Sequence, residues 1–351
     1  MSSTLEKHIL EGIDGFKTLF RSAGFYNQIE VERVIDQSLE EIFGERPSSD
    51  KLQNHEILTV YFMRGFYAYK RKNYDKAIDF FLPIYESPCE SFESMDDKAR
   101  VSHLLGVIWN EKRNYSKAKS AFEISISLLK SLKKPFFEAQ VHHSYGNLLT
   151  NRGLYDLAEN EFENSLTLLR NVEEIPSKIE AKGMVYHSLG IMLSKIPERW
   201  SDAQEAYRVS INSLKEINDL LGQANVTISL GKLLSKRQNS LDEAEKTFKQ
   251  SYNLLKEINN PYLKTKSQAR IYHELGNLCG KKRVGWDEAE DAFKQSIELF
   301  DKIDDFREIF NVYYDYGKML RNDENIISIF LSPILSLMVI WGNGIIEPFP
   351  K

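Results

Sequence analysis

The stretch HHSYGNLLTNRGLYDLAENEFENSL, residues 142–166, contains the pattern that decides the fold of this 351-residue chain. Gly146 is followed, after a short polar turn, by Ala158 and then, four residues later, by Phe162. The pattern predicts a helix, a turn and a second helix. The glycine and the alanine are the small residues where the two helices cross closely, and the phenylalanine lies one helical turn beyond the alanine on the same face.

The same three residues recur along most of the chain. Glycines stand 40 to 45 residues apart, at Gly65, Gly106, Gly146, Gly190, Gly231, Gly276 and Gly317. Each of the first six is followed after twelve or thirteen residues by an alanine, at Ala77, Ala118, Ala158, Ala203, Ala244 and Ala289. Four residues after each alanine stands an aromatic residue, at Phe81, Phe122, Phe162, Tyr207, Phe248 and Phe293. The repetition predicts an all-α array of helix–turn–helix units.

The turns and helix starts also follow a pattern, with some departures. A residue of N-cap type precedes each alanine, at Asp75, Ser116, Asp156, Ser201, Asp242 and Asp287, and we expect these residues to cap the second helices. In four units a Glu or Gln three residues later completes a capping box, at Glu159, Gln204, Glu245 and Glu290. Lys72 and Arg113 replace the turn glycine, and a serine takes the later small position at Ser125, Ser165, Ser210, Ser251 and Ser296.

This set of residues resembles the tetratricopeptide repeats over about residues 57–322. Units that open with Tyr-His-x-Leu-Gly, as residues 186–190 and 272–276 do, look like the long-period arrays of bacterial and archaeal signalling and sensor proteins. The period exceeds the roughly 34 residues that are usual in the family, so helices or connections must be longer. The resemblance implies a superhelical solenoid that serves as a non-catalytic protein-interaction scaffold.

We expect three segments along the chain. Residues 1–56 are interpreted as degenerate N-terminal capping helices, and residues 57–325 as the array, with six clear repeats and the first helix of a seventh. Residues 326–351 form a hydrophobic C-terminal segment, in which 326–346 carry no charge. Pro333 falls where the aromatic residue should stand and ends the pattern. The segment is interpreted either as a membrane anchor or as a helix that covers the open end of the array.

Composition and motifs narrow the function. With 42% hydrophobic residues, 28% charged residues and a net charge of −5, the chain is typical of a globular protein rather than of one that coats nucleic acid. Cys89 and Cys279 lack metal-like spacing, and the N-terminus lacks a secretory signal, so we expect a cytoplasmic protein. Nucleotide-binding, hydrolase, metalloprotease and redox motifs are absent. The sequence therefore predicts no catalytic residues, no metal and no cofactor.

The resemblance also implies which positions face the groove of the solenoid: six and three before each glycine, and one, four and five after it. The binding candidates are His143, Asn147, His187, Lys195, Lys232, Lys236, Arg270, His273, Asn277, Lys281, Lys318 and Arg321. From Lys195 onward, the groove positions hold seven basic residues and no acidic one. The lysine and arginine clamp of some family members is not reproduced, because histidine takes the place of its first lysine.

The basic run suggests an acidic partner. We expect an acidic peptide segment or a terminal carboxylate, with Asn147 and Asn277 offering amides to a bound backbone. One alternative is a regulatory subunit that binds a nucleic acid or another anionic ligand through the basic C-terminal half of the groove. Another is that the lysines only complement helix dipoles. The sequence leaves the partner's identity and the oligomeric state open.

Histidine stands three before the glycine in four units, at His103, His143, His187 and His273. Equivalent positions in successive units lie about 10 Å apart, which is too far for a shared metal ion. We interpret these histidines as polar side chains that bond to the neighbouring repeat, with direct contact to a ligand as the alternative.

Overall fold

The computed structural model describes residues 55–88, 92–173, 175–282 and 286–321, and these form helices and short connections without any strand. Nearly all of the expected N-terminal capping segment and the whole hydrophobic segment 326–351 lie outside the described residues. The chain divides into two compact units, Met1–Glu174 and Ile175–Lys351, and each is described by itself. Within the described parts, the expected all-α fold is confirmed.

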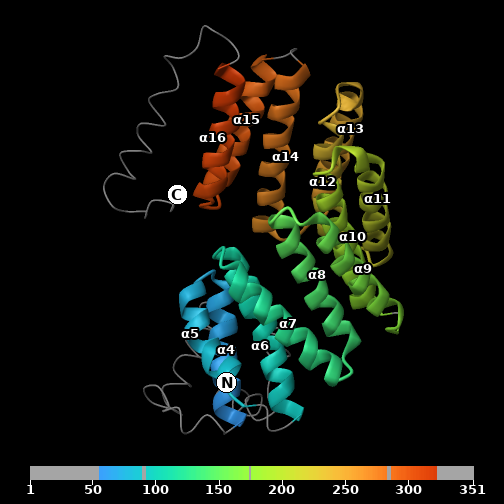
Figure 1. Ribbon diagram of the computed structural model, residues 1–351. Helices are drawn as coiled ribbons and strands as arrows, with labels where there is room; N and C mark the ends of the chain where they lie inside the picture. Colours follow the sequence, from blue (N-terminus) through green and yellow to red (C-terminus); the bar gives the residue numbers. More distant parts are fainter. Residues whose placement is uncertain (1–54, 89–91, 174, 283–285, 322–351) are drawn as a thin grey trace. The chain divides into compact units, whose positions relative to one another are not determined.

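The described part of the first unit contains three helix pairs, which Figure 1 shows from blue to green. Its helices are α4 (His55–Lys70), α5 (Tyr74–Glu86), α6 (Phe92–Glu111), α7 (Tyr115–Ser131), α8 (Pro135–Asn151) and α9 (Tyr155–Arg170). The densest packing joins α4 with α5, α6 with α7 and α8 with α9. Each pair therefore corresponds to one unit of the sequence repeat.

Among the described residues, the second unit contains three further pairs and, after them, one more helix. Its helices are α10 (Pro176–Leu193), α11 (Trp200–Glu216), α12 (Leu220–Leu234), α13 (Leu241–Leu255), α14 (Pro261–Lys282), α15 (Trp286–Asp301) and α16 (Phe306–Arg321), with short 3₁₀ turns at Pro197–Arg199 and Gln238–Ser240. The pairs are α10 with α11, α12 with α13 and α14 with α15, and α16 packs on α15 and α14.

The repeated glycine receives the aromatic ring of its own pair. A Cβ built on Gly231 would lie 2.5 Å from a ring carbon of Phe248, and the other five pairs show the same contact at 2.5–2.9 Å. Phe248 is fully buried. Aromatic rings of successive repeats also stack on one another. Phe293 of one pair stacks on Tyr316 of the following first helix, and the two ring centroids are 5.0 Å apart. The predicted close crossing is confirmed, since only glycine leaves room for the ring.

The repeated serine holds the two helices of a pair together. Ser251 Oγ donates to the main-chain carbonyl of Ala224 at 2.9 Å, and both residues are fully buried. The same bond recurs in four other pairs, joining Ser125 to Ala99, Ser165 to Ala139, Ser210 to Gly183 and Ser296 to Ala269. The carbonyl always belongs to a small residue seven positions before the glycine. A hydroxyl in this place is therefore a cross-link between helices, which alanine could not supply.

The predicted N-caps are wrong by about two residues. The second helices begin earlier, so Asn73 and Asn114 are the caps of α5 and α7, and each accepts from the main-chain nitrogen three residues on at 3.3 Å. The cap positions of α9, α11 and α13 make no side-chain bond, and no capping box forms there. The acidic residues of the motif, such as Asp75, lie inside the first turn. Their negative charge interacts favourably there with the positive end of the helix dipole.

The turns within the first two pairs adopt a left-handed conformation without glycine. Lys72 and Arg113 have φ of 58° and 57°, while Gly153 occupies the equivalent turn of the third pair with φ of 73°. In the Arg113 turn, the main-chain nitrogen of Asn114 donates to Trp109 O and that of Arg113 to Asn110 O, the Schellman pattern of a helix end. Two of these turns are thus made under backbone strain.

Replacing Arg113 with glycine is expected to raise the free energy of unfolding by about 0.5–1 kcal/mol, because glycine adopts positive φ without the steric cost of a Cβ. Gly153→Ala is the converse substitution. Nothing lies within 4 Å of the added Cβ, so only the conformational cost acts. The free energy of unfolding is expected to fall by about 1 kcal/mol. Urea denaturation followed by circular dichroism measures both. Changes of the same sign in the two variants would contradict this explanation.

No helix in the described ranges combines the length and apolarity needed to cross a membrane. This finding lends no support to membrane association, and segment 326–346, on which that alternative rested, is outside those ranges. The cytoplasmic location stays a prediction from sequence.

Candidate ligand-binding face

Lys236 of the second unit lies close enough to three other lysines for their charges to act on it. We call Lys195, Lys232, Lys236 and Lys281 the lysine cluster; they stand at or just beyond the C-terminal ends of α10, α12 and α14. Burial lowers the pKa of Lys236, and the positive charges of Lys195, Lys232 and Lys281 lower it further. The cluster therefore concentrates positive charge in a protein whose net charge is negative.

Two members of the cluster are anchored by the preceding repeat. Lys236 Nζ donates to Ser194 O, at the end of α10, at 2.7 Å. Lys281 Nζ donates to Ser235 O, at the end of α12, at 3.0 Å. Both carbonyls belong to C-cap residues, where a cation also complements the helix dipole. Each of these two lysines therefore caps the first helix of the preceding repeat and not its own helix, as the dipole interpretation would have it.

Two carboxylates that sequence reasoning missed lie on the same face. Lys232 Nζ is 2.7 Å from Glu274 Oε1, and Lys318 Nζ is 3.9 Å from Asp315 Oδ1. Burial lowers the pKa of Lys281, although the charges of Glu274 and Asp315 act in the opposite direction. Both acids stand two residues before the repeat glycine, a position absent from the set expected to face the ligand. The excess of positive charge therefore lies toward α10 and α12.

Lys195, Lys236 and Lys281 form no ion pair with any described residue, although the charges of Glu274 and Asp315 act on Lys281. Lys195 is exposed, and the main chain places it immediately after the C-cap of α10. An anionic ligand would find these ammonium groups without having to displace an internal acid.

Arg270 and Asn225 extend the face along α14 and α12. Arg270 Nη1 donates to Asn225 Oδ1 at 3.2 Å. His187 of α10 is close by: burial lowers its pKa to about 4, and the charge of Arg270 contributes. Residues from three successive first helices thus meet here.

The prediction that the repeated histidines bond to the following repeat is confirmed at His103 and His187. His103 Nε2 is 2.8 Å from Ser144 Oγ, and His187 Nε2 is 2.9 Å from Ser229 Oγ. Ser144 Oγ also donates to Gln140 O, so its only proton is used and the imidazole must be the donor. Each ring also packs beside the aromatic residue of its own pair, as His103 does with Phe122 at 6.1 Å.

The remaining candidates are engaged in other internal contacts. His273 Nε2 lies 3.0 Å from Asp315 Oδ2, and Asn277 Nδ2 donates to the same oxygen at 3.4 Å. His143 and Asn147 belong to α8 of the first unit, where their side chains are 3.3 Å apart. The structure describes no side chain for Arg321.

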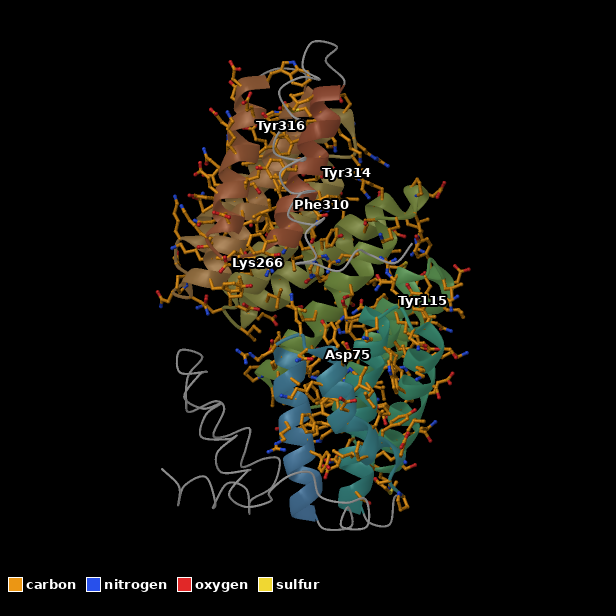
Figure 2. The ribbon with its side chains drawn as sticks, turned by 90° about the vertical axis from the view of Figure 1, so that its left-hand side faces the viewer. Asp75, Tyr115, Lys266, Phe310, Tyr314 and Tyr316 are labelled. Carbon is orange, nitrogen blue, oxygen red and sulfur yellow. The ribbon has the colours of Figure 1, made fainter. Side chains whose placement is uncertain are left out.

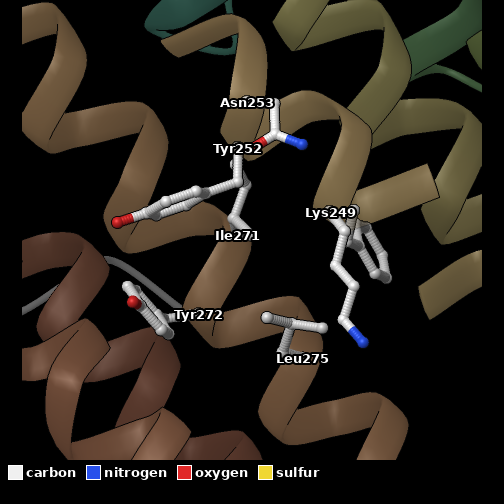
Figure 3. Close-up of a pocket in the computed structure, with 7 residues that line it drawn as sticks. Lys249, Tyr252, Asn253, Ile271, Tyr272 and Leu275 are labelled. Atoms are coloured by element: carbon white, nitrogen blue, oxygen red, sulfur yellow. The ribbon is translucent and has the colours of Figure 1, made fainter. Parts of the chain in front are cut away.

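A shallow open cavity of about 310 Å³ lies elsewhere, between α13 and α14 (Figure 3). The rings of Tyr252 and Tyr272 stand nearly perpendicular in its wall, with centroids 6.1 Å apart, and Leu275 lines it as well. None of the predicted binding residues reaches this cavity, and nothing in the repeat pattern signalled it.

Comparison with known proteins identifies the fold. No protein-family model and no curated protein matches the sequence. Among solved structures, the apo form of the quorum sensor NprR from B. thuringiensis matches with a TM-score of 0.67 and 15% identity, over 96% of this chain and 86% of that one. A Rap protein complexed with competence and sporulation factor matches with a TM-score of 0.51 and 15% identity, over 92% and 99% of the two chains. These are tetratricopeptide-type repeat proteins.

The chain has a tetratricopeptide-like fold. BtubC from P. vanneervenii adds a further match, with a TM-score of 0.52 and 12% identity over 70% of this chain and 93% of that one. The expected tetratricopeptide-like solenoid is therefore confirmed. At these identities the likeness establishes the fold.

Proposed function

We propose that this tetratricopeptide-like protein is a non-catalytic scaffold or sensor that binds an acidic protein or peptide segment at the lysine cluster. The observation that carries the proposal is the gathering of four ammonium groups from three successive repeats, of which only Lys232 forms an ion pair with a described residue. Like charges held together raise the free energy of the unliganded face, and a bound anion relieves that repulsion.

Two structural neighbours support a peptide as the ligand. One is the Rap protein complexed with competence and sporulation factor. The other is a Rap conjugation gene regulator of plasmid pLS20, solved in complex with the Phr* peptide, with a TM-score of 0.51 and 17% identity over 92% of this chain and 94% of that one. The fold therefore suits an extended peptide, and the lysine cluster would select its acidic groups.

The side chain of Asn277 would hold the main chain of such a peptide. Its amide donates one hydrogen to Asp315. A side-chain amide has two N–H donors, so one remains for a backbone carbonyl of the ligand. Specificity would then come from the lysines, and position along the face from this amide.

The test compares a charge-reversed face with a matched control. Lys195→Glu with Lys232→Glu removes two cluster cations that make no bond to a main-chain carbonyl. Lys215→Glu with Lys246→Glu changes the net charge equally on the second helices α11 and α13, where both lysines are exposed. The probes are an arrayed library of fluorescent peptides, and the same peptides with Asp and Glu replaced by Asn and Gln.

We expect the wild type to select peptides rich in carboxylates. The Lys195→Glu, Lys232→Glu variant should bind them at least about tenfold more weakly, which corresponds to the loss of about 1.4 kcal/mol. The control pair should bind them within a factor of about two to three. Selection without acidic enrichment, or equal losses in the two variants, would contradict the proposal.

A nucleic acid on the same face is distinguished by salt. Each phosphate contact adds to the slope of log affinity against log salt, roughly 0.7 for each contact with a single strand. We expect a single-stranded oligonucleotide to bind more weakly than the selected peptide at 150 mM salt, about the physiological ionic strength. Tighter oligonucleotide binding that the same two substitutions abolish would favour the nucleic-acid alternative instead.

A further inference from the structure

The last described helix presents aromatic residues to solvent. Phe306, Phe310 and Tyr314 follow one another at intervals of four along α16 and are 58%, 62% and 58% exposed. Figure 2 shows Phe310 and Tyr314 on this helix. Spacing by four places the three side chains along one side of a helix. Three neighbouring aromatic rings in water are a larger apolar patch than scattered surface residues make, and they mark a contact surface.

This side of α16 is the one that earlier first helices turn toward their own second helices. Phe310 stands seven residues before Gly317, the position where five earlier pairs have a buried alanine or glycine whose carbonyl accepts the serine bond. Tyr314 holds the place of the histidine that packs beside the aromatic ring of the second helix. Nothing among the described residues lies within 4 Å of a Cβ on Gly317. Among the described residues, α16 is a first helix without its second.

We propose that residues 326–346 of the same chain cover the aromatic side of α16. These residues follow α16 after the polar connection NDEN, residues 322–325. Earlier pairs use connections of similar length, such as the three residues between Glu111 and Tyr115. A segment of 21 residues without charge is long enough to pass along the 16-residue α16, and its burial against three rings is favourable.

The covering segment must pack differently from an ordinary second helix. A phenylalanine at position 310 replaces the small residue that lets the two helices approach. Pro333 stands where an aromatic residue would enter the space beside Gly317. The contact would therefore be made through the rings of α16 rather than through its glycine. This arrangement closes the end of the array and does not depend on what the lysine cluster binds.

Site-specific photo-crosslinking in the full-length protein tests the proposal. A photoreactive phenylalanine analogue replaces Phe310, and in a control variant it replaces Glu298, which is exposed on α15. Equal amounts of unlabelled and ¹⁵N-labelled protein are mixed before irradiation, so mass spectrometry separates cross-links within one chain from those between copies. One arm is run with phosphatidylcholine vesicles. Thermal unfolding confirms that both variants fold.

We expect position 310 to cross-link mainly to residues 326–346 of its own chain, at a yield independent of protein concentration and unchanged by vesicles. Position 298 should give few such products. Mixed-isotope products would assign the surface to a second copy, and lipid adducts would assign the segment to a membrane. Either result, or the absence of products in 326–346, would overturn the proposal.

Discussion

Phe248→Ala is expected to lower the free energy of unfolding by about 3–5 kcal/mol, the largest effect of any single substitution considered for this protein. The ring is fully buried and fills the space above Gly231. It belongs to a core that includes Ile228, Leu255 and Ile271 from three different helices. Its removal leaves a cavity inside the pair and beside the next one, so local repacking cannot close it.

Urea denaturation followed by circular dichroism measures this loss. Tyr262→Ala is the control, because that ring is 49% exposed and its removal should cost no more than about 0.5 kcal/mol. Hydrogen exchange in α12 and α13 shows whether the loss is confined to this pair or spreads through the second unit, as interface coupling in a repeat array predicts. Similar losses for Phe248 and Tyr262 would contradict the assignment of Phe248 to the core.

Gly231→Ala tests the same contact from the other side. Alanine inside a helix normally gains about 1 kcal/mol over glycine. Here the added Cβ would meet the Phe248 ring at 2.5 Å, and overpacking costs about 1–3 kcal/mol, so a net loss is expected. Gly317→Ala, where the described chain leaves the Cβ unobstructed, should instead be neutral or stabilising. A higher free energy of unfolding in both variants would show that the aromatic rings do not pack against the repeat glycines.

Acidification from pH 7 to pH 4 is expected to destabilise the protein through two histidines, by on the order of 2–3 kcal/mol for each. Burial lowers the pKa of His103 to about 4, and burial with the nearby Arg270 charge does the same for the pKa of His187. In the unfolded chain both titrate near pH 6.5. Between pH 6.5 and pH 4 the unfolded state binds protons that the folded state does not. The free energy of unfolding therefore decreases as the pH is lowered, and this decrease levels off near pH 4.

The measurement is the free energy of unfolding against pH for the wild type and for His103→Gln with His187→Gln. Glutamine keeps a neutral N–H donor for the serine but cannot titrate. Carboxylates contribute equally to both curves, so their difference isolates the histidines. We expect the difference to change between pH 6.5 and 4 and to stay constant above 7. A difference that is independent of pH would show that these histidines are readily protonated in the folded state.

The fold was predictable from sequence where all the residues that contact one another belong to a single repeat. Gly231, Ala244 and Phe248 meet inside a single helix pair, so their spacing was sufficient to predict the crossing. The predicted helix starts were wrong because residues of N-cap type stand both before the helix and inside its first turn. Spacing from the alanine favoured the residue inside the first turn. Asn73 and Asn114 were visible in the sequence as better caps. The serines were read as substitutions for alanine because their acceptor lies 26 or 27 residues earlier.

The binding face was predictable only in part, because it depends on contacts between repeats. Repeat position named Lys195, Lys232, Lys236 and Lys281 as candidates, and the charges of the other three act on Lys236. It could not show that Lys236 and Lys281 reach back more than forty residues to cap the preceding helix. Nor did it include the acids two places before the glycine, although the serines that bond to histidine in other repeats hold that same position.

Lysine footprinting tests whether the lysine cluster binds an acidic ligand. An amine-reactive reagent modifies neutral lysines, so the lowered pKa of Lys236 should make it react faster than Lys215 in the free protein. A bound acidic peptide should slow the modification of Lys195, Lys232 and Lys236 several-fold, since its carboxylates shield these lysines and favour their charged forms. Lys215 should be unaffected. Equal rates with and without the peptide at the three cluster lysines would contradict the account.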